Sequence, residues 1–98
     1  MSLVTLVVAG CAGPAPRTHA TEIRGFQYLP SVVTVSAGDT VAWTNLDLVP
    51  HTASASGTKM DTGSIESKGT GRVVAGAKGT YSYVCAFHPD MKGTLVVQ

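Results

Sequence analysis

The sequence predicts an all-β domain with the architecture of a β-sandwich. Short segments rich in β-branched and aromatic residues alternate with turns rich in glycine and proline. No segment keeps its apolar residues at the 3.6-residue period of an amphipathic helix. With 98 residues, of which 44% are hydrophobic, the chain has room for one domain with one modest core. Short strands joined by such turns are typical of two packed sheets.

The alternating segments give the expected strands. Val32 to Val35 is a β-branched run that follows Pro30 and precedes a glycine-containing turn. Residues 56–71 are rich in glycine, serine, threonine and lysine, and we expect a loop there with at most one helical turn. The expected strands are residues 19–26, 32–35, 40–44, 72–75, 80–85 and 94–97.

The strand over residues 80–85 has a chemical consequence. Side chains alternate between the two faces of a strand, so Tyr81, Tyr83 and Cys85 share one face. If the tyrosines point into the sandwich, Cys85 points inward at the end of the strand. A buried thiolate is costly without a positive partner, and a metal ion supplies one.

The first residues have a different character. An apolar run over residues 3–8 leads into Val-Ala-Gly-Cys at residues 8–11, which resembles a secretory segment that ends in a bacterial lipobox with Cys11 as the lipidated residue. The run is too short to span a bilayer as a helix. Two prolines in residues 12–16 indicate a linker. We therefore expect a signal or lipobox remnant and linker over residues 1–17 and a folded domain over residues 18–98; a first β-strand or a Cys11–Cys85 disulfide are the alternatives.

The charge pattern excludes one class of partner. The formal net charge is +1, and the seven lysines and arginines are spread along the chain. No basic run is available to neutralise phosphates, so nucleic acid is not expected as a partner.

The strongest functional signal is a set of soft donor side chains. Cys85, His88 and Met91 follow one another at intervals of three residues, and His51 lies upstream in a Pro-His-Thr segment. Two histidines and one cysteine with a weak axial methionine are the donor set of electron-transfer copper. A structural zinc site would prefer four Cys and His ligands. A Cys–His nucleophile would need an orienting third group beside a substrate cleft.

These motifs resemble those of a known family. Residues 79–94 are similar to the C-terminal signature of small cupredoxins, residues 36–45 and 50–52 to the upstream segment, and residues 60–63 to the middle loop. The two-residue gaps in the Cys-His-Met string are most similar to those of the amicyanin group of plastocyanin-type proteins. The resemblance covers residues 19–98. It implies an eight-stranded Greek-key sandwich with one copper ion, Cu(I) or Cu(II), in which His51, Cys85 and His88 form a trigonal plane and Met91 is axial.

The resulting hypothesis is a type 1 copper protein that passes one electron between redox proteins and is not an enzyme. A copper-delivery lipoprotein of the same fold is the alternative. We expect His88 to be the ligand nearest solvent, with Phe87, Pro50 and Pro89 forming an apolar docking patch for the electron donor and acceptor. We also expect a monomer in the periplasm or another extracytoplasmic compartment, tethered to the membrane if Cys11 is lipidated.

Two residues are expected to support the ligands. Asn45 ends a strand six residues before His51, and we interpret it as a tie within the loop, with an ordinary turn residue as the alternative. The backbone N–H of Thr52 is expected to donate a hydrogen bond to the sulfur of Cys85.

Overall fold

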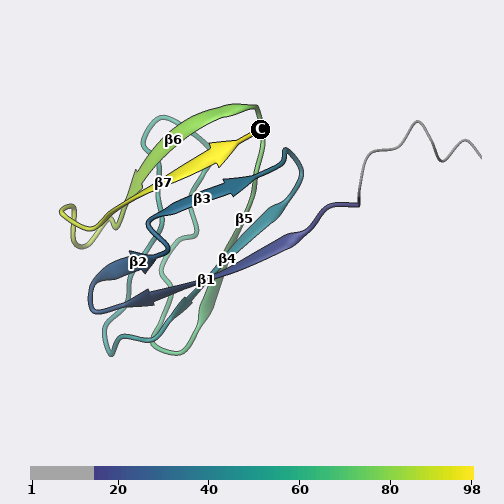
Figure 1. Ribbon diagram of the computed structural model, residues 1–98. Helices are drawn as coiled ribbons and strands as arrows, with labels where there is room; N and C mark the ends of the chain where they lie inside the picture. Colours follow the sequence, from purple (N-terminus) through teal and green to yellow (C-terminus); the bar gives the residue numbers. More distant parts are fainter. Residues whose placement is uncertain (1–14) are drawn as a thin grey trace, which may run out of the picture.

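The computed structural model describes residues 15–98, and these residues form two β-sheets packed face to face (Figure 1). The first sheet has the order β2-β1-β4-β5 and the second has the order β3-β7-β6. The strands are β1 (Thr18–Arg24), β2 (Gln27–Leu29), β3 (Val32–Val35), β4 (Thr40–Asn45), β5 (Thr70–Val74), β6 (Gly79–Val84) and β7 (Lys92–Val97). The all-β class is confirmed. Within residues 15–98 no helix is long and apolar enough to cross a membrane.

Seven strands are present in this range, one fewer than the resemblance implied. Between β4 and β5 the chain pairs only through isolated bridges, such as the one between His51 and Ile65, because turns interrupt it every few residues. Residues 56–69 contain no helical turn, and residues 70 and 71 already belong to β5.

The segment expected to be one strand over residues 19–26 is in fact a strand followed by a hairpin turn. Arg24 of β1 pairs with Gln27 of β2, which leaves Gly25 and Phe26 as a two-residue turn. Both turn residues have positive φ angles, 62° for Gly25 and 59° for Phe26. Two consecutive residues of this kind match a type I′ turn, whose twist suits antiparallel strands. Alternation alone did not reveal this turn, because Phe26 continues the apolar pattern.

Aromatic residues fill the centre between the sheets. Trp43, Tyr28 and Tyr83 are each at most 1% exposed. The rings of Tyr28 and Tyr83 meet edge to face with centroids 4.7 Å apart, and those of Trp43 and Tyr83 at 5.4 Å. A side chain at Gly93 would collide with the Tyr83 ring, so glycine is required for this close approach. Trp43 is a core residue.

The topology gathers three connections at one end of the sandwich. β1 runs parallel to β4, and β6 runs antiparallel to β7. The β1–β2 turn, the loop after β4 and the β6–β7 loop therefore lie at the same end (Figure 1). The C-terminus and the start of β1 lie at the opposite end.

Candidate metal centre

Two of these connections carry the predicted ligands. His51 belongs to the loop after β4, and its backbone exchanges hydrogen bonds of 3.1 and 2.7 Å with Ile65. Cys85, His88 and Met91 belong to the β6–β7 loop. Ser54 joins the two loops, because its backbone exchanges two 2.9 Å hydrogen bonds with Val84, the last residue of β6.

The β6–β7 loop is closed by its own backbone. The amide of His88 donates to the carbonyl of Cys85 at 3.2 Å, and the amide of Met91 donates to the carbonyl of His88 at 2.9 Å. The amide of Cys85 donates to the carbonyl of Met91 at 3.2 Å. These bonds fold the loop back on itself and bring Cys85, His88 and Met91 close to one another.

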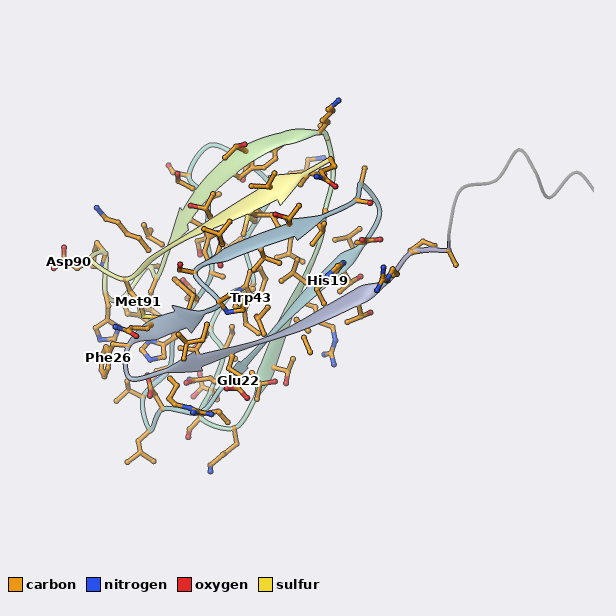
Figure 2. All side chains as sticks on the ribbon, in the orientation of Figure 1. His19, Glu22, Phe26, Trp43, Asp90 and Met91 are labelled. Carbon is orange, nitrogen blue, oxygen red and sulfur yellow. The ribbon has the colours of Figure 1, made fainter. Side chains whose placement is uncertain are left out.

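The structure brings three of the predicted ligands into one cluster. The donor atoms of His51, Cys85 and His88 lie within 4.8 Å of one another. The Sγ atom of Cys85 is 3.7 Å from Nδ1 of His51 and 3.7 Å from Nδ1 of His88. Met91 is 4% exposed and lies at the same end of the molecule (Figure 2). His19 lies toward the other end, in β1, away from the cluster.

The cluster fits a metal ion. Metal-bound nitrogen and sulfur atoms in zinc sites lie about 2.0 and 2.3 Å from the ion, so two such ligands at a trigonal angle are about 3.7 Å apart. Both sulfur–nitrogen distances in this structure are 3.7 Å. A free thiol, two imidazoles and a nearby thioether are soft donors, which suit copper better than a hard cation.

The four residues differ in their access to solvent. His51 and Cys85 are 0% exposed and Met91 is 4% exposed. His88 is only partly buried. His88 is therefore the member nearest solvent, as the sequence predicted.

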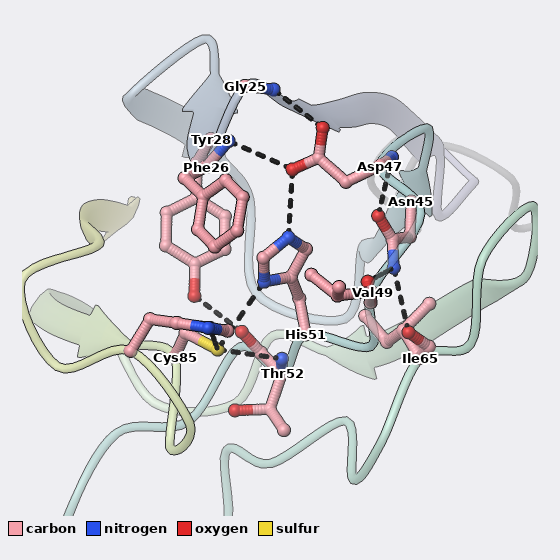
Figure 3. A network of polar contacts seen from close by, with 11 residues as sticks. Gly25, Phe26, Tyr28, Asn45, Asp47, Val49, His51, Thr52, Ile65 and Cys85 are labelled. Carbon is pink, nitrogen blue, oxygen red and sulfur yellow. Dashed lines mark hydrogen bonds and ion pairs between the residues drawn. The ribbon is translucent and has the colours of Figure 1, made fainter.

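Thr52 forms hydrogen bonds with the thiol of Cys85, the amide of Ala86 and the hydroxyl of Tyr28 (Figure 3). Its backbone N–H donates to Cys85 Sγ at 3.3 Å, which confirms the prediction for this residue. Its hydroxyl oxygen accepts a 2.8 Å hydrogen bond from the amide of Ala86, and its carbonyl accepts one from the hydroxyl of Tyr28. Burial and the nearby thiol of Cys85 raise the pKa of Tyr28, so its hydroxyl keeps the proton that it donates.

Asn45 ties the loop that carries His51. Its amide nitrogen Nδ2 donates to the carbonyls of Val49 and Ile65 at 2.8 and 2.9 Å. Its Oδ1 atom accepts a 2.9 Å hydrogen bond from the amide of Asp47. Asn45 is fully buried, so these bonds satisfy a side chain that would otherwise be costly to bury. The interpretation of Asn45 as a tie is confirmed.

Asp47 was not predicted from the sequence. Its carboxylate accepts hydrogen bonds from His51 Nε2 at 2.8 Å, from the amide of Gly25 at 2.7 Å and from the amide of Phe26 at 2.9 Å (Figure 3). Burial acts to raise the pKa of Asp47, but the hydrogen bonds from Phe26, Gly25 and His51 outweigh it and lower the pKa. The only available signal was the spacing of an acidic residue four positions before His51.

Exposed apolar residues flank His88 and His51 in the two loops that carry them. Phe87 is 52% exposed, and Pro50 and Pro89 are exposed as well. Phe26, Leu48 and Val49 are also exposed but were not predicted, although the Leu-Val-Pro run directly before His51 is a visible signal for two of them. We call the full set the apolar rim: Phe26, Leu48, Val49, Pro50, Phe87 and Pro89.

The chain is similar to known copper proteins along most of its length. The model of the cupredoxin-like domain family matches residues 1–97. The chain belongs to the cupredoxin-like family. Amicyanin-alpha of Methylorubrum extorquens is 36% identical over 90 residues, which cover 87% of this chain and 75% of that protein. Amicyanin of Paracoccus versutus is 31% identical over 81 residues, which cover 78% of this chain and 61% of that protein.

A solved structure is also similar to this chain. The oxidised state of a proline-to-alanine variant of amicyanin superposes with a TM-score of 0.77 at 27% identity, and the match covers 83% of this chain and 82% of that chain. Family membership and the His-Cys-His cluster together define the protein as a blue copper electron-transfer protein. It carries one copper ion, and amicyanin-like cupredoxins are electron carriers rather than enzymes.

Proposed function

We propose that His51, Cys85, His88 and Met91 bind the copper ion through which this protein passes electrons. The observation that carries the proposal is the position of Cys85 Sγ, 3.7 Å from Nδ1 of each histidine. Copper supplies the reversible one-electron change between Cu(I) and Cu(II). We assign the three residues of the cluster to a trigonal plane and Met91 to the weak axial position.

The chain contributes a rigid frame around these donors. Both ligand loops are fixed by backbone hydrogen bonds at the end of a packed sandwich, so the donor atoms have little freedom to move when the charge on the ion changes. His51, Cys85 and Met91 are buried, which favours a copper ion that is retained through many cycles. A copper-delivery protein would instead need accessible, exchangeable ligands, so the delivery alternative is less well supported.

We propose the apolar rim as the surface that meets the electron donor and the electron acceptor. His88 reaches the surface within it, and Phe87 is the most exposed aromatic side chain there. With a net charge of +1, we expect docking by a monomer to depend on apolar contact more than on charge steering. Phe87→Glu should slow electron transfer to a native partner and leave the copper spectrum unchanged. A normal rate, together with a steep salt dependence, would place docking elsewhere.

We also propose an extracytoplasmic, periplasmic location with residues 1–17 as lipobox remnant and linker and residues 18–98 as the copper domain. Cys11 lies outside the described residues, so the support for lipidation is the Val-Ala-Gly-Cys sequence. β1 starts at the end of the sandwich opposite the β6–β7 loop, so a tether at Cys11 would join the domain at the end away from the proposed ligands (Figure 1). Mass spectrometry of protein expressed in a bacterium with a complete leader tests this: an unmodified Cys11 contradicts it.

The copper site itself is tested by comparing the two cysteines. Wild-type protein should become intensely blue or green with Cu(II), because a thiolate bound to copper gives a charge-transfer band. Cys85→Ser should be colourless, whereas the control Cys11→Ser should keep the full colour. Met91→Leu should keep the colour and change the reduction potential, as expected for an axial ligand. A coloured Cys85→Ser variant would exclude Cys85 as the thiolate ligand.

A further inference from the structure

The β1–β2 turn and the metal cluster are joined by a single carboxylate. Asp47 Oδ2 accepts hydrogen bonds from both His51 Nε2 and the amide of Phe26, and Oδ1 accepts one from the amide of Gly25. The Asp47 side chain is 12% exposed, and the side chain of His51 is fully buried. The two bonds to the turn span 22 and 21 positions in the sequence, whereas His51 is only four positions from Asp47.

The carboxylate determines which nitrogen of His51 is free. An ionised carboxylate only accepts hydrogen bonds, so the proton of a neutral His51 ring must be on Nε2. The lone pair is then on Nδ1, which is the nitrogen 3.7 Å from Cys85 Sγ. A hydrogen bond to the second ring nitrogen orients a metal-binding histidine and increases its basicity.

The same carboxylate holds a turn in an unfavourable conformation. Phe26 has a φ of 59°, which a residue with a side chain adopts only at a cost in conformational free energy. Asparagine or glycine is the usual choice at such a turn position. The backbone amide of Phe26 is fixed by Asp47, and this directs the ring toward the metal cluster.

The Phe26 ring contacts both imidazoles of the cluster. Its centroid is 5.0 Å from that of His51 and 4.8 Å from that of His88, with interplanar angles of 83° and 84°. The two imidazole centroids are themselves 5.2 Å apart. The three rings therefore pack edge to face around one corner of the site, and Phe26, which is 48% exposed, covers the solvent side.

We propose that Asp47 is a positioning residue that holds His51 in its metal-binding orientation and fixes the Phe26 turn as a cap over both histidines. This inference rests on the proposed ligands. It makes the β1–β2 turn part of the copper site, although the turn contributes no ligand. The carboxylate also places a negative charge one hydrogen bond from a ligand, which stabilises Cu(II) relative to Cu(I).

The protein contains a matched control for this arrangement. Asp39 accepts hydrogen bonds from His19 Nε2 at 2.9 Å and from the amides of Arg17 and Ser36, each at 3.0 Å. It thus binds the same three kinds of donor as Asp47. His19 lies away from the metal cluster (Figure 2). Asp39→Ala removes an equivalent set of bonds without touching the copper site.

The first experiment uses the apoprotein and the Cu(I) protein. Proton–nitrogen NMR at a fixed neutral pH should show a slowly exchanging Nε2–H signal for His51 in the wild type. The signal should persist in Asp47→Asn, whose amide oxygen still accepts, and disappear through exchange in Asp47→Ala. Phe26→Leu removes the ring but leaves the three hydrogen bonds, so the signal should persist there too. An unchanged signal in Asp47→Ala would overturn the proposal.

The second experiment measures copper affinity and reduction potential. Asp47→Ala should weaken Cu(II) binding by about 10- to 100-fold, and Asp47→Asn should raise the reduction potential because the charge is lost. Asp39→Ala should change neither quantity. If Asp47→Ala does not fold, the potential of Asp47→Asn still decides: a potential equal to that of the wild type overturns the proposal. A wild-type protein without colour would overturn the copper ligand set, while the apoprotein NMR would still test Asp47.

Discussion

Two carboxylates with almost the same partners occupy opposite ends of this sandwich. Asp39 accepts from His19 Nε2 and two backbone amides, and Asp47 accepts from His51 Nε2 and two backbone amides. Both join segments about twenty residues apart in the sequence. The difference is in the histidine: the side chain of His19 is 27% exposed, whereas that of His51 is fully buried.

The comparison shows that a local arrangement does not define a function by itself. The Asp39 pair fastens the start of β1 to the turn before β4, and its histidine is partly solvated. At the other end, the second ring nitrogen of His51 faces the thiol of Cys85. The same carboxylate–histidine pair ties β1 to the turn before β4 at one end and, at the other, holds the histidine that we propose as a copper ligand.

The largest effect is expected from removing each histidine in turn. His51→Ala should lose the blue colour and most of the Cu(II) affinity, because a ligand is gone. His19→Ala should keep the colour and lose about 1 kcal/mol of unfolding free energy, the typical value of one hydrogen bond. Copper titrations followed by visible spectra and denaturant unfolding measure both. Equal copper spectra for the two variants would contradict the assignment of His51, and not His19, as a copper ligand.

Acid should weaken the contribution of the Asp39–His19 pair to stability in a defined pH range. The amide of Arg17, His19 and the amide of Ser36 lower the pKa of Asp39 from 3.8 to about 2. The stabilisation that follows from this lowered pKa is complete above about pH 4 and is lost as the pH falls toward 2, because the unfolded chain takes up the proton first. Unfolding of the apoprotein should therefore show a steep loss of stability in this range.

The control for this prediction is Asp39→Asn, which cannot titrate. Its stability should be lower at neutral pH and should fall less steeply between pH 4 and pH 2. Some slope should remain, because the pKa of Asp47 is also lowered. Parallel curves for the variant and the wild type would show that Asp39 contributes nothing to acid unfolding.

The smallest effect concerns Phe26 and Lys68, the non-glycine residues with positive φ within residues 15–98. Lys68, with a φ of 70°, is exposed and far from the carboxylate pairs in sequence. Lys68→Gly should raise the unfolding free energy by about 0.5–1 kcal/mol, because relief of the backbone exceeds the entropy cost of glycine. Phe26→Gly should instead lower it, by up to about 1 kcal/mol, because two ring contacts are lost as well. If both substitutions raised the unfolding free energy, the Phe26 ring would not stabilise the end that carries the metal cluster.

The sequence predicted the features that depend on local pattern. The run Val32–Val35 is the strand β3 with the expected bounds, and Cys85 is buried on the face predicted from Tyr83. His51 was placed near Cys85 by resemblance to a family, since no local rule joins residues 34 positions apart. That expectation agrees with the observed distance of 3.7 Å.

The features that escaped prediction depend on contacts between distant segments. Asp47 looks like an ordinary turn acid until Gly25 and Phe26 are seen to donate to it. Phe26 continued an apolar alternation, so its positive φ was not visible in the pattern. The strand β2 was also missed, because its three residues are too few to show a period of their own.

The hydrogen bonds around Thr52, Asn45 and Asp47 have a consequence for the order of assembly. Each of them joins protein groups to one another, and every buried side-chain nitrogen and oxygen in residues 15–98 has such a partner. The chain can therefore reach its final shape before it meets copper, unlike a zinc finger, which needs its metal in order to fold. Folding and loading with metal are then separate events. The supply of copper then decides how many of the folded chains are active carriers.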